Sequence, residues 1–562
     1  MLHNFTTGLP HWYDSTPGGY AALATFLAAF VFIGCVSTFA RQSDAPSDWR
    51  WGAALAALLA VGRWPTWFIT RELNPDESHF IAGATTLNLD PVFWRSVDGI
   101  TAGPLDFYAL LPVSWLSNGV SFFSARITAW LLLSTTLVLL HQAITLRFGR
   151  SVARVSTFSA ATMEAFSMNR ELLHYSSELV SLSLLALAVF CAVKQAANAK
   201  GTKWGYVGAL ALGSVPFAKL QAVPPALGMG LAWLAWTSIR LRNDSGRLRE
   251  LSALVAGSLT PLLIVSVGLT TTGQWEHAIL PYYFNNLAYV EGGRHSLKAV
   301  FVELWAHISA EGTLLGAWIF GAILCALGGL ILSERRKDRG LILGAFALFA
   351  LSLFGIVTPG RIFPHYCQLL LVPGVLMTGF GLGAATMAVQ TKSRLAPLML
   401  AAGLLVTSGP ALLERATIDA PYIRHLSFFQ QHPQSEVPSI IRHFALPGEP
   451  LAVWGWMNNY YSETGLSLAH RTPNSAGELL PGPLQDYYRN RYLQDIERNK
   501  PAIFVDAVAP ENFYFRSPEE RHDVAFPKLA AYIREAYTLV AEVRGVRIYV
   551  SNVRLNGANG ND

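Results

Sequence analysis

The stretch Arg71–Leu111, RELNPDESHFIAGATTLNLDPVFWRSVDGITAGPLDFYALL, lies between long apolar runs and carries the adjacent carboxylates Asp76 and Glu77. The pair follows the helix-breaking dipeptide Asn74-Pro75, at the point where an apolar run ends. Charged side chains at such a boundary of the bilayer are costly to place, which makes them functional candidates. The structural alternative is that Asp76 caps the following helix by accepting hydrogen bonds from its free N–H groups.

The composition is that of a polytopic membrane protein. Of the 562 residues, 52% are hydrophobic and 14% are charged, and the mean hydropathy is +0.33, which is too apolar for an ordinary soluble enzyme. The net charge of +5 does not indicate a nucleic-acid partner, because most Lys and Arg lie in short clusters between apolar runs. The four cysteines show no metal-binding spacing, so we expect them to be packing residues.

Apolar runs predict about twelve transmembrane helices, because a span needs roughly 20 apolar residues. The runs lie near residues 19–40, 51–70, 124–145, 152–168, 179–197, 204–218, 222–239, 251–271, 313–332, 340–357, 367–389 and 395–412. The Pro-interrupted pair 204–218 and 222–239 is either two short spans or one re-entrant hairpin.

Charge bias orients these spans. Loops with Lys and Arg clusters, such as residues 335–339, are expected to be cytoplasmic. The loops at 71–123, 169–178, 272–312 and 358–366 are richer in aromatics and poor in cations, so we expect them on the exoplasmic side. Within the first of these loops, Ser78–Leu87 and Leu105–Leu116 have the helical spacing of amphipathic helices that lie in the membrane interface.

The domain plan follows from a change of composition after the last span. We expect a transmembrane domain at 1–412, a linker at 413–426 and a small α/β domain at 427–562, with both termini on the exoplasmic side. Strand-like runs occur at 451–456, 502–506, 538–543 and 546–550, and helical segments at 484–497 and 527–536. A hairpin turn is expected at Arg544-Gly545.

Polar side chains that packing does not explain are expected at the outer membrane boundary, in the four exoplasmic loops and, for Lys219, in the Pro-flanked turn between 204–218 and 222–239. They are Asp76, Glu77, His79, Arg170, Glu171, His174, Glu178, Lys219, Trp275, Glu276, His277, Arg361, His365 and Tyr366. Carboxylates beside Lys, Arg and His suit a general base with cationic clamps for an anion such as phosphate. Structural alternatives stay open: Lys219 extends along the span to reach the interface, Arg361 contacts lipid headgroups, and His365 is an interface histidine. The sequence contains no nucleophile elbow, P-loop, dinucleotide fingerprint or HExxH motif.

The order of these features resembles the GT-C superfamily of polyprenyl-phosphate-sugar-dependent glycosyltransferases, in the branch of bacterial aminoarabinose transferases and protein O-mannosyltransferases. The shared features are the acidic Asp76-Glu77 pair in the first long exoplasmic loop, two interfacial helices, and Ala125-Arg126 at the start of the next span. A membrane bundle then precedes an exoplasmic domain. The resemblance implies a GT-C-like helical bundle with a C-terminal extracytoplasmic α/β domain.

The resemblance also implies roles for individual residues. Asp76 would be the catalytic base or a metal-contacting carboxylate, with Glu77 and Glu178 as further catalytic candidates. The Lys-Pro-Pro-Leu-like stretch of the family is Ala102-Gly103-Pro104-Leu105 here, without the lysine. Other cations would therefore bind the donor phosphate, namely Lys219, Arg170 and Arg361. The substrate-binding candidates are His79, His174, His365 and Tyr366. The metal requirement stays open, and Asp76 and Glu178 would supply hard oxygen ligands to a divalent ion.

The implied activity is transfer of a hexose or pentose from polyprenyl phosphate to an acceptor hydroxyl, with inversion. The acceptor would be a cell-envelope glycolipid, a polysaccharide or a protein at the exoplasmic face of the bacterial inner membrane. The partners are therefore the lipid-linked donor, the acceptor and the bilayer. Two alternatives are a transporter or flippase for lipid-linked sugars and a glycan-binding scaffold. Against transport, the hydropathy shows no obvious repeat and the polar residues cluster on one side of the membrane.

Overall fold

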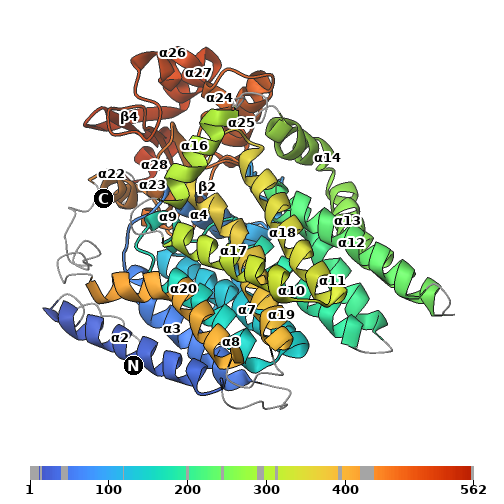
Figure 1. The fold of residues 1–562 in the computed structure, drawn as a ribbon. Coiled ribbons are helices and arrows are strands. Elements are labelled where there is room, and N and C mark those ends of the chain that lie inside the picture. Colours follow the sequence, from blue (N-terminus) through green and yellow to red (C-terminus); the bar gives the residue numbers. More distant parts are fainter. Residues whose placement is uncertain are drawn as a thin grey trace. The chain divides into compact units, whose positions relative to one another are not determined.

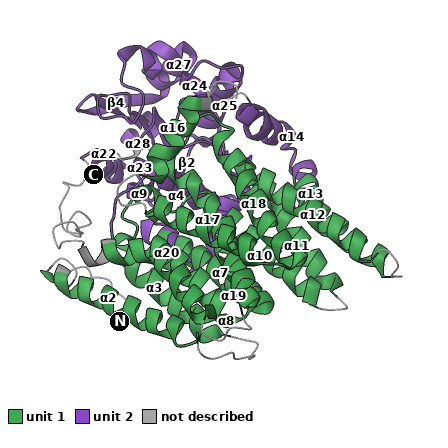
Figure 2. Cartoon of the chain, viewed as in Figure 1, with its two compact units in different colours: residues 1–68, 126–268, 293–428 green, residues 69–125, 269–292, 429–562 purple. Residues whose placement is uncertain are grey.

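The computed structural model describes residues 12, 15–39, 48–117, 119–197, 201–241, 246–287, 297–309, 314–389, 395–417 and 436–558. Most of these residues are helical (Figure 1). The chain divides into two compact units, each built from separated segments (Figure 2). The first unit holds residues 1–68, 126–268 and 293–428, and the second holds residues 69–125, 269–292 and 429–562. Most of the predicted linker, from residue 418 onward, lies outside the described residues.

The first unit is a bundle of helices. Its α-helices are α2 (Pro17–Val36), α3 (Trp49–Trp67), α7 (Phe122–Phe148), α8 (Arg150–Phe166), α9 (Arg170–Leu173), α10 (Glu178–Ala197), α11 (Thr202–Ser214), α12 (Val223–Arg240), α13 (Arg247–Thr272), α16 (Leu297–Ile308), α17 (Leu315–Leu332), α18 (Arg336–Val357), α19 (Leu371–Val389) and α20 (Leu395–Thr417). Short 3-10 turns η1 (Val215–Phe217) and η2 (Leu220–Ala222) join α11 to α12, and η4 (Pro364–Leu370) leads into α19.

Helix α19 forms the centre of the bundle. Residues 365–386 are all buried, and α19 packs against α17, α18, α20 and α8. Glycines let α17 and α19 approach closely: a Cβ on Gly381 would lie 2.2 Å from the carbonyl oxygen of Cys325, and one on Gly329 would lie 2.5 Å from the carbonyl oxygen of Gly381. Small residues at a helix crossing are typical of membrane bundles, where close backbone packing replaces the hydrophobic effect.

The protein is a multi-pass membrane protein. Among the residues that the structure describes, nine helices are long and apolar enough to cross a membrane. They are Gly18–Val36, Phe122–Phe148, Glu178–Ala197, Leu220–Arg240, Arg247–Thr272, Leu315–Leu332, Arg336–Val357, Pro364–Val389 and Leu395–Leu413. All twelve predicted runs are helical, but α8 has 17 residues and α11 has 13, which is short for a span. Helix α3 has 19 residues, but two arginines lower its hydropathy.

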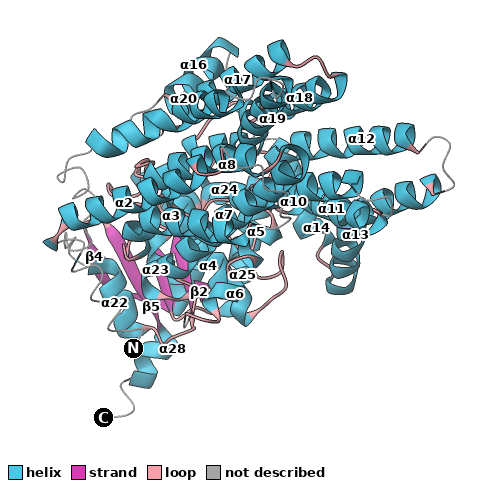
Figure 3. Ribbon diagram, turned by 60° about the horizontal axis from the view of Figure 1, so that its bottom comes forward, coloured by secondary structure: helices cyan, strands magenta, loops and turns pink. Residues whose placement is uncertain are grey.

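The second unit contains a mixed sheet. In its described part, strands β1 (Pro450–Trp454), β2 (Ser467–Leu468), β3 (Ile503–Asp506), β4 (Tyr537–Val543) and β5 (Val546–Ser551) are arranged in the order β2-β1-β3-β5-β4 (Figure 3). Strand β1 is parallel to β2 and β3, and β5 is antiparallel to β3 and β4. In register, Leu451 faces Ile503 and Val505 faces Ile548. The predicted α/β domain is confirmed.

Helices cover this sheet and extend the unit. They are α4 (Pro75–Leu89), α5 (Pro104–Tyr108), α6 (Leu111–Ser114), α14 (Trp275–Ala278), the π-helix η3 (Ile279–Phe284), α22 (Glu436–Phe444), α23 (Asn459–Thr464), α24 (Ala476–Leu479), α25 (Gln485–Asn499), the 3-10 turn η5 (Pro518–Glu520), α26 (His522–Ala525), α27 (Pro527–Ala536) and α28 (Asn552–Ala558). Trp454 and Phe504 from the strands form one core cluster with Tyr492 of α25 and Leu529 of α27.

Helix α4 packs against the C-terminal part of the chain within the same unit. It contacts β2, α23 and α5, and the backbone N–H of Leu468 donates to Thr86 Oγ1 at 2.8 Å. The helix predicted over Ser78–Leu87 therefore exists, but it is not amphipathic. Ten of its fifteen residues are buried, because β2 and α23 cover one side and Phe107 of α5 another.

Candidate functional site

Lys219 and Glu178 form a buried ion pair in the first unit. Lys219 is held in extended backbone between η1 and η2, and Glu178 is the first residue of α10. Lys219 Nζ donates to Ser177 Oγ at 2.6 Å and lies 3.4 Å from Glu178 Oε1. Lys219 is 4% exposed and Glu178 is 0% exposed. Pairing with Glu178, rather than extension along the span, therefore stabilises the Lys219 charge.

Residues of η4 surround this pair. Lys219 Nζ lies 5.2 Å from the centroid of the Tyr366 ring, a distance typical of a cation–π contact. The neighbouring His365 bonds through Nδ1 to Glu171 Oε2 at 2.7 Å, and its ring meets the His174 ring edge to face at 5.5 Å. The structure thus places polar residues from α9, α10, the η1–η2 turn and η4 in one cluster.

Two predicted phosphate ligands lie on the surface of the same unit. Arg170 is the first residue of α9, where the Asn169 side chain accepts a hydrogen bond from the Glu171 N–H at 3.0 Å. Arg361 precedes η4, in the loop that carries His365. Both arginines are exposed, in contrast to the buried Lys219.

Asp76 and Glu77 lie in the first turn of α4, in the second unit. The helix is capped by Asn74, whose Oδ1 accepts a hydrogen bond from the Asp76 N–H at 2.8 Å. The alternative that Asp76 caps the helix is therefore wrong, because the N-cap residue is Asn74. Glu77 is buried, and its Oε2 accepts from the Leu73 N–H at 3.2 Å. The Asp76 carboxylate lies in the first turn of the helix, at the positive end of the helix dipole.

Further carboxylates lie around this helix start. The pKa of Glu72 is raised to about 7, first by burial and then by the negative charges of Glu77, Glu463 and Asp76, against the lowering effect of Ser78. Carboxylate oxygens are ligands that a hard divalent cation prefers, but these four residues are not a set with the atom spacing of a metal site in the described part of the chain. Glu178 fits a cation less well, because the Lys219 ammonium already occupies its Oε1 side.

His79 occupies an aromatic setting in the same helix. Its ring centroid lies 5.6 Å from that of Phe80 and 5.5 Å from that of Phe107, and the residue is buried. The predicted site residues therefore fall into two groups. Glu178, Lys219, His174, His365 and Tyr366 gather in the first unit, and Asp76, Glu77 and His79 share one helix of the second unit.

Sequence reasoning missed several members of these groups: Ser177, Gln368, Glu72 and Glu463. Ser177 accepts from Lys219, and Gln368 accepts from Ser176 Oγ at 3.1 Å and donates to the Leu172 carbonyl at 3.3 Å. Single Ser and Gln residues carry no sequence signal. Glu463 lies nearly 400 residues from Glu72 in the chain, so only the folded structure reveals that its charge acts on Glu72.

The described residues contain one cluster with the atom spacing of a metal site, formed by Asp506, His522 and Asp523. Its ligand atoms already have partners. Asp506 Oδ2 accepts from the N–H and Nδ1 of His522 at 3.1 and 2.6 Å, and Asp523 Oδ2 accepts from Arg547 at 3.0 Å. We interpret this cluster as a hydrogen-bond network that ties α26 to the sheet.

Comparison with known proteins assigns the fold. No protein-family model and no curated protein sequence matches the chain. Among solved structures, ArnT from Cupriavidus metallidurans bound to undecaprenyl phosphate aligns with a TM-score of 0.58 and 13% identity, over 90% of this chain and 98% of that chain. The fold of the chain is ArnT-like. ArnT in the apo state aligns with a TM-score of 0.50 and 14% identity, over 88% of this chain and 97% of that chain. The GT-C-like helical bundle expected from the order of segments is confirmed as a fold.

Proposed function

We propose that the protein is an integral-membrane glycosyltransferase that moves a sugar from a polyprenyl-phosphate donor to an acceptor hydroxyl. The ArnT-like fold carries this proposal, because the alignment covers 90% of this chain and 98% of an ArnT structure bound to undecaprenyl phosphate. The acceptor is a cell-envelope glycolipid, a polysaccharide or a protein. The reaction takes place at the exoplasmic face of a bacterial inner membrane, where the C-terminal domain also lies.

Asp76 is the catalytic base in this proposal. Asn74 fixes the start of α4 and so orients the Asp76 carboxylate. The carboxylate removes the proton from the acceptor hydroxyl while the hydroxyl oxygen attacks the anomeric carbon. The bond from that carbon to the donor phosphate breaks on the opposite face, so the anomeric configuration inverts. Glu77 supports this geometry by accepting from the Leu73 N–H ahead of the helix.

Cations bind the donor phosphate and stabilise it as it leaves. Arg170 and Arg361 are exposed and offer planar guanidinium groups, which bind phosphate oxygens in pairs. Lys219 contributes the third cation. Its ammonium donates to Ser177 Oγ and forms an ion pair with Glu178. Glu178 thus acts through Lys219, while His174, His365 and Tyr366 line the sugar-binding side.

A divalent cation, if the enzyme uses one, would be held by Asp76 with its neighbour Glu77, and not by Glu178, whose Oε1 already pairs with Lys219. It would supply positive charge to the leaving phosphate. The residues of this chain perform the other steps: Asp76 holds and moves the proton, and the arginines and Lys219 hold the phosphate.

Asp76→Asn tests the proposal. We expect the purified variant, reconstituted with polyprenyl-phosphate sugars and envelope acceptors, to lose transfer by at least 100-fold, the lower end of what a general base contributes. Asp486→Asn is the matched control, because Asp486 is an exposed carboxylate in the first turn of another helix of the same unit. Mass spectrometry of the product identifies the sugar and its carrier.

The same assay separates the alternatives. A flippase moves the lipid-linked sugar across the bilayer without forming a new glycosidic bond, and a scaffold leaves donor and acceptor unchanged. Full transfer by correctly folded Asp76→Asn protein contradicts the assignment of the base. Comparison of glycolipids and glycoproteins from cells with and without the protein then identifies the natural acceptor by the sugar it lacks.

A further inference from the structure

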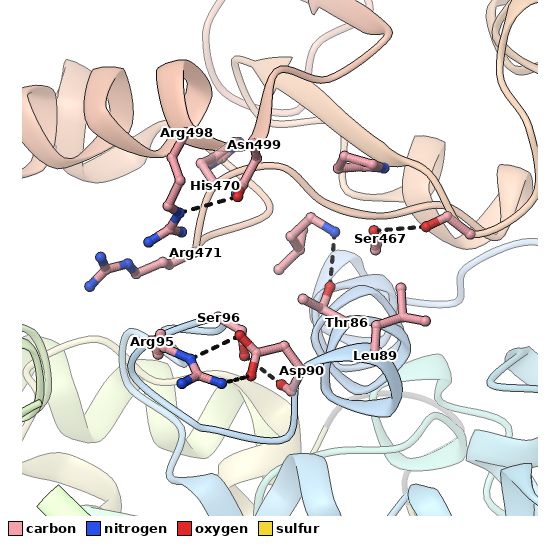
Figure 4. A pocket seen from close by; sticks show the side chains of 13 residues that line it. Thr86, Leu89, Asp90, Arg95, Ser96, Ser467, His470, Arg471, Arg498 and Asn499 are labelled. Carbon is pink, nitrogen blue, oxygen red and sulfur yellow. Dashed lines mark hydrogen bonds and ion pairs between the residues drawn. The ribbon is translucent and has the colours of Figure 1, made fainter. Parts of the chain in front are cut away.

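A cavity of about 420 Å³ lies within the second unit, between the end of α4 and the C-terminal domain (Figure 4). This volume is within the range of small-molecule sites, roughly 300–1,000 Å³. Its lining residues come from the α4 end and the following loop, from the β1–β2 region and from the end of α25: Thr86, Leu89, Asp90, Arg95, Ser96, Gly448, Pro450, Ser467, Leu468, His470, Arg471, Arg498 and Asn499. None of them belongs to the proposed catalytic groups.

Positive charge exceeds negative charge around this cavity. Asp90 is bound by Arg95 through both carboxylate oxygens, one bond measuring 3.0 Å. Arg471 and Arg498 share a single carboxylate, since both form ion pairs with Asp495, Arg471 through Nε at 3.2 Å and Arg498 through Nη2 at 3.1 Å. Three arginines thus face two aspartates. One unit of positive charge is left for a ligand.

The charge states of Asp90 and His470 preserve this excess of positive charge. Although burial favours the neutral acid, the hydrogen bonds from Arg95 and the charges of Arg95 and Arg498 hold the pKa of Asp90 below its usual range. Burial, and next to it the charge of Arg491, lowers the pKa of His470 to about 3, so this histidine is neutral at physiological pH. Arg498 is 49% exposed and can turn toward a ligand, whereas Arg471 is buried in the wall.

The rest of the lining combines polar and apolar groups. Ser96, Ser467 and Asn499 supply hydroxyl and amide groups, and Leu89 and Pro450 supply apolar surface. A sugar ring presents hydroxyl groups at its edge and C–H groups on its faces, which matches this mixture. The excess guanidinium charge favours a sugar that also carries an anionic group.

We propose that this cavity binds an acidic saccharide, a sugar that carries a carboxylate or a phosphate, and that it holds the part of the acceptor that does not react. Its role as an acceptor subsite rests on the proposed glycosyltransferase function. The binding site itself rests only on the cavity, its excess charge and its polar lining.

Direct binding to the full-length protein in nanodiscs tests the assignment. The probes are digalacturonic acid, glucosamine 6-phosphate and the neutral disaccharide digalactose, measured by calorimetry without any lipid-linked donor. We expect at least one acidic probe to bind at least tenfold more tightly than digalactose, and this preference to weaken as salt screens the arginines. Which acidic probe binds more tightly distinguishes a carboxylate ligand from a phosphate ligand. Equal affinity of acidic and neutral probes overturns the proposal.

Substitutions in the cavity provide the matched comparison. Leu89 is 62% exposed and ends α4, so Leu89→Glu adds a negative charge and Leu89→Lys a positive one with little effect on folding. We expect Leu89→Glu and Arg498→Gln to weaken acidic-probe binding about five- to tenfold, and Leu89→Lys to preserve or strengthen it. Arg544→Gln is the control, because Arg544 lies in the β4–β5 turn, pairs with Glu511 and does not line the cavity. Equal binding by all four variants overturns the proposal.

Transfer assays then distinguish this inference from the proposed function. If the wild-type protein binds acidic saccharides with the expected variant pattern but transfers no sugar, the glycosyltransferase proposal fails and the binding site stands. If the protein transfers sugar but Leu89→Glu changes neither probe affinity nor the acceptor KM, the cavity assignment fails and the glycosyltransferase proposal stands.

Discussion

Several buried charges of this protein are paired, and the pair formed by Lys219 and Glu178 contains a cation of the proposed phosphate site. Removal of one partner leaves an uncompensated charge in a low-dielectric interior, which costs about 3–5 kcal/mol. Replacement of both by apolar or neutral groups of similar size costs far less. The net contribution of the pair to the stability of the fold is therefore small. Its main effect is to hold the positive charge of Lys219 at a fixed position.

Glu178→Gln is expected to destabilise the protein by about 3 kcal/mol, because Lys219 would then be buried without a carboxylate. The double variant Glu178→Gln/Lys219→Met should recover most of this loss. Thermal unfolding in detergent measures both. Transfer activity should fall in both variants, since the second also lacks the cation. If Glu178→Gln and the double variant unfold at the same temperature, the charges of Glu178 and Lys219 do not contribute to stability through their interaction.

Glu72 makes stability depend on pH. Its pKa is raised from 4.5 to about 7 in the folded protein, by burial first and then by neighbouring carboxylates, so the folded state binds its proton more tightly than the unfolded state does. This group therefore contributes stability at low pH, and the contribution is lost as pH rises from about 4.5 through 7. Glu72→Gln should flatten this dependence and stabilise the protein by about 2 kcal/mol at pH 8. Unchanged pH profiles of unfolding would contradict the expected shift.

At the scale of single elements, α4 shows how a local cap supports a functional residue. Asn74→Ala should cost about 1 kcal/mol, since the Asp76 N–H loses its acceptor. Because Asp76 lies in the turn that then frays, we expect kcat to fall more than the stability loss alone explains. Asn74→Asp is the control, because aspartate also caps helices. If kcat falls equally in Asn74→Ala and Asn74→Asp, capping does not explain the effect and the expectation is wrong.

The contact between α17 and α19 sets a limit on side-chain size. A Cβ on Gly381 would lie 2.2 Å from a backbone oxygen of α17, which cannot move aside as a side chain can. Gly381→Ala should therefore destabilise the bundle by about 1–3 kcal/mol. Gly328→Ala is the matched control, because no atom lies within 4 Å of the Cβ position at Gly328 in the same helix pair. Thermal unfolding of the two variants measures the difference.

Elements with a strong local pattern were predictable. The hairpin turn at Arg544-Gly545 follows from its glycine, and both residues have positive φ, of 48° and 89°. Strand β2 has two residues, too few for an alternating pattern. The burial of α4 on several sides was also hidden, because the segments that cover it are distant in sequence. Local periodicity describes a helix, whereas its partners depend on the whole fold.

At the scale of the whole molecule, the order of segments indicated the GT-C-like fold, and the ArnT-like structure confirms it at 13% identity. Composition and charge bias are averages over many residues, so they survive extensive sequence change. The roles of Asp76, Lys219 and the arginines stay predictions, because they depend on single side chains. Three of the twelve expected spans, α3, α8 and α11, do not meet the criteria for a span: α8 has 17 residues and α11 has 13, and α3 contains two arginines. Average hydropathy along a sequence does not fix where a helix begins and ends.

The packing of α4 against β2 has a consequence for biosynthesis. Thr86 and Leu468, which are hydrogen-bonded, are 382 residues apart. At about 5–20 residues per second, the ribosome needs roughly 20–80 seconds to make the chain between them. During that interval the apolar faces of α4 lack the strand and helix that later cover them. A chain that ends at residue 417 would keep them uncovered, and we expect it to be degraded or retained by chaperones, as pulse-chase labelling would show.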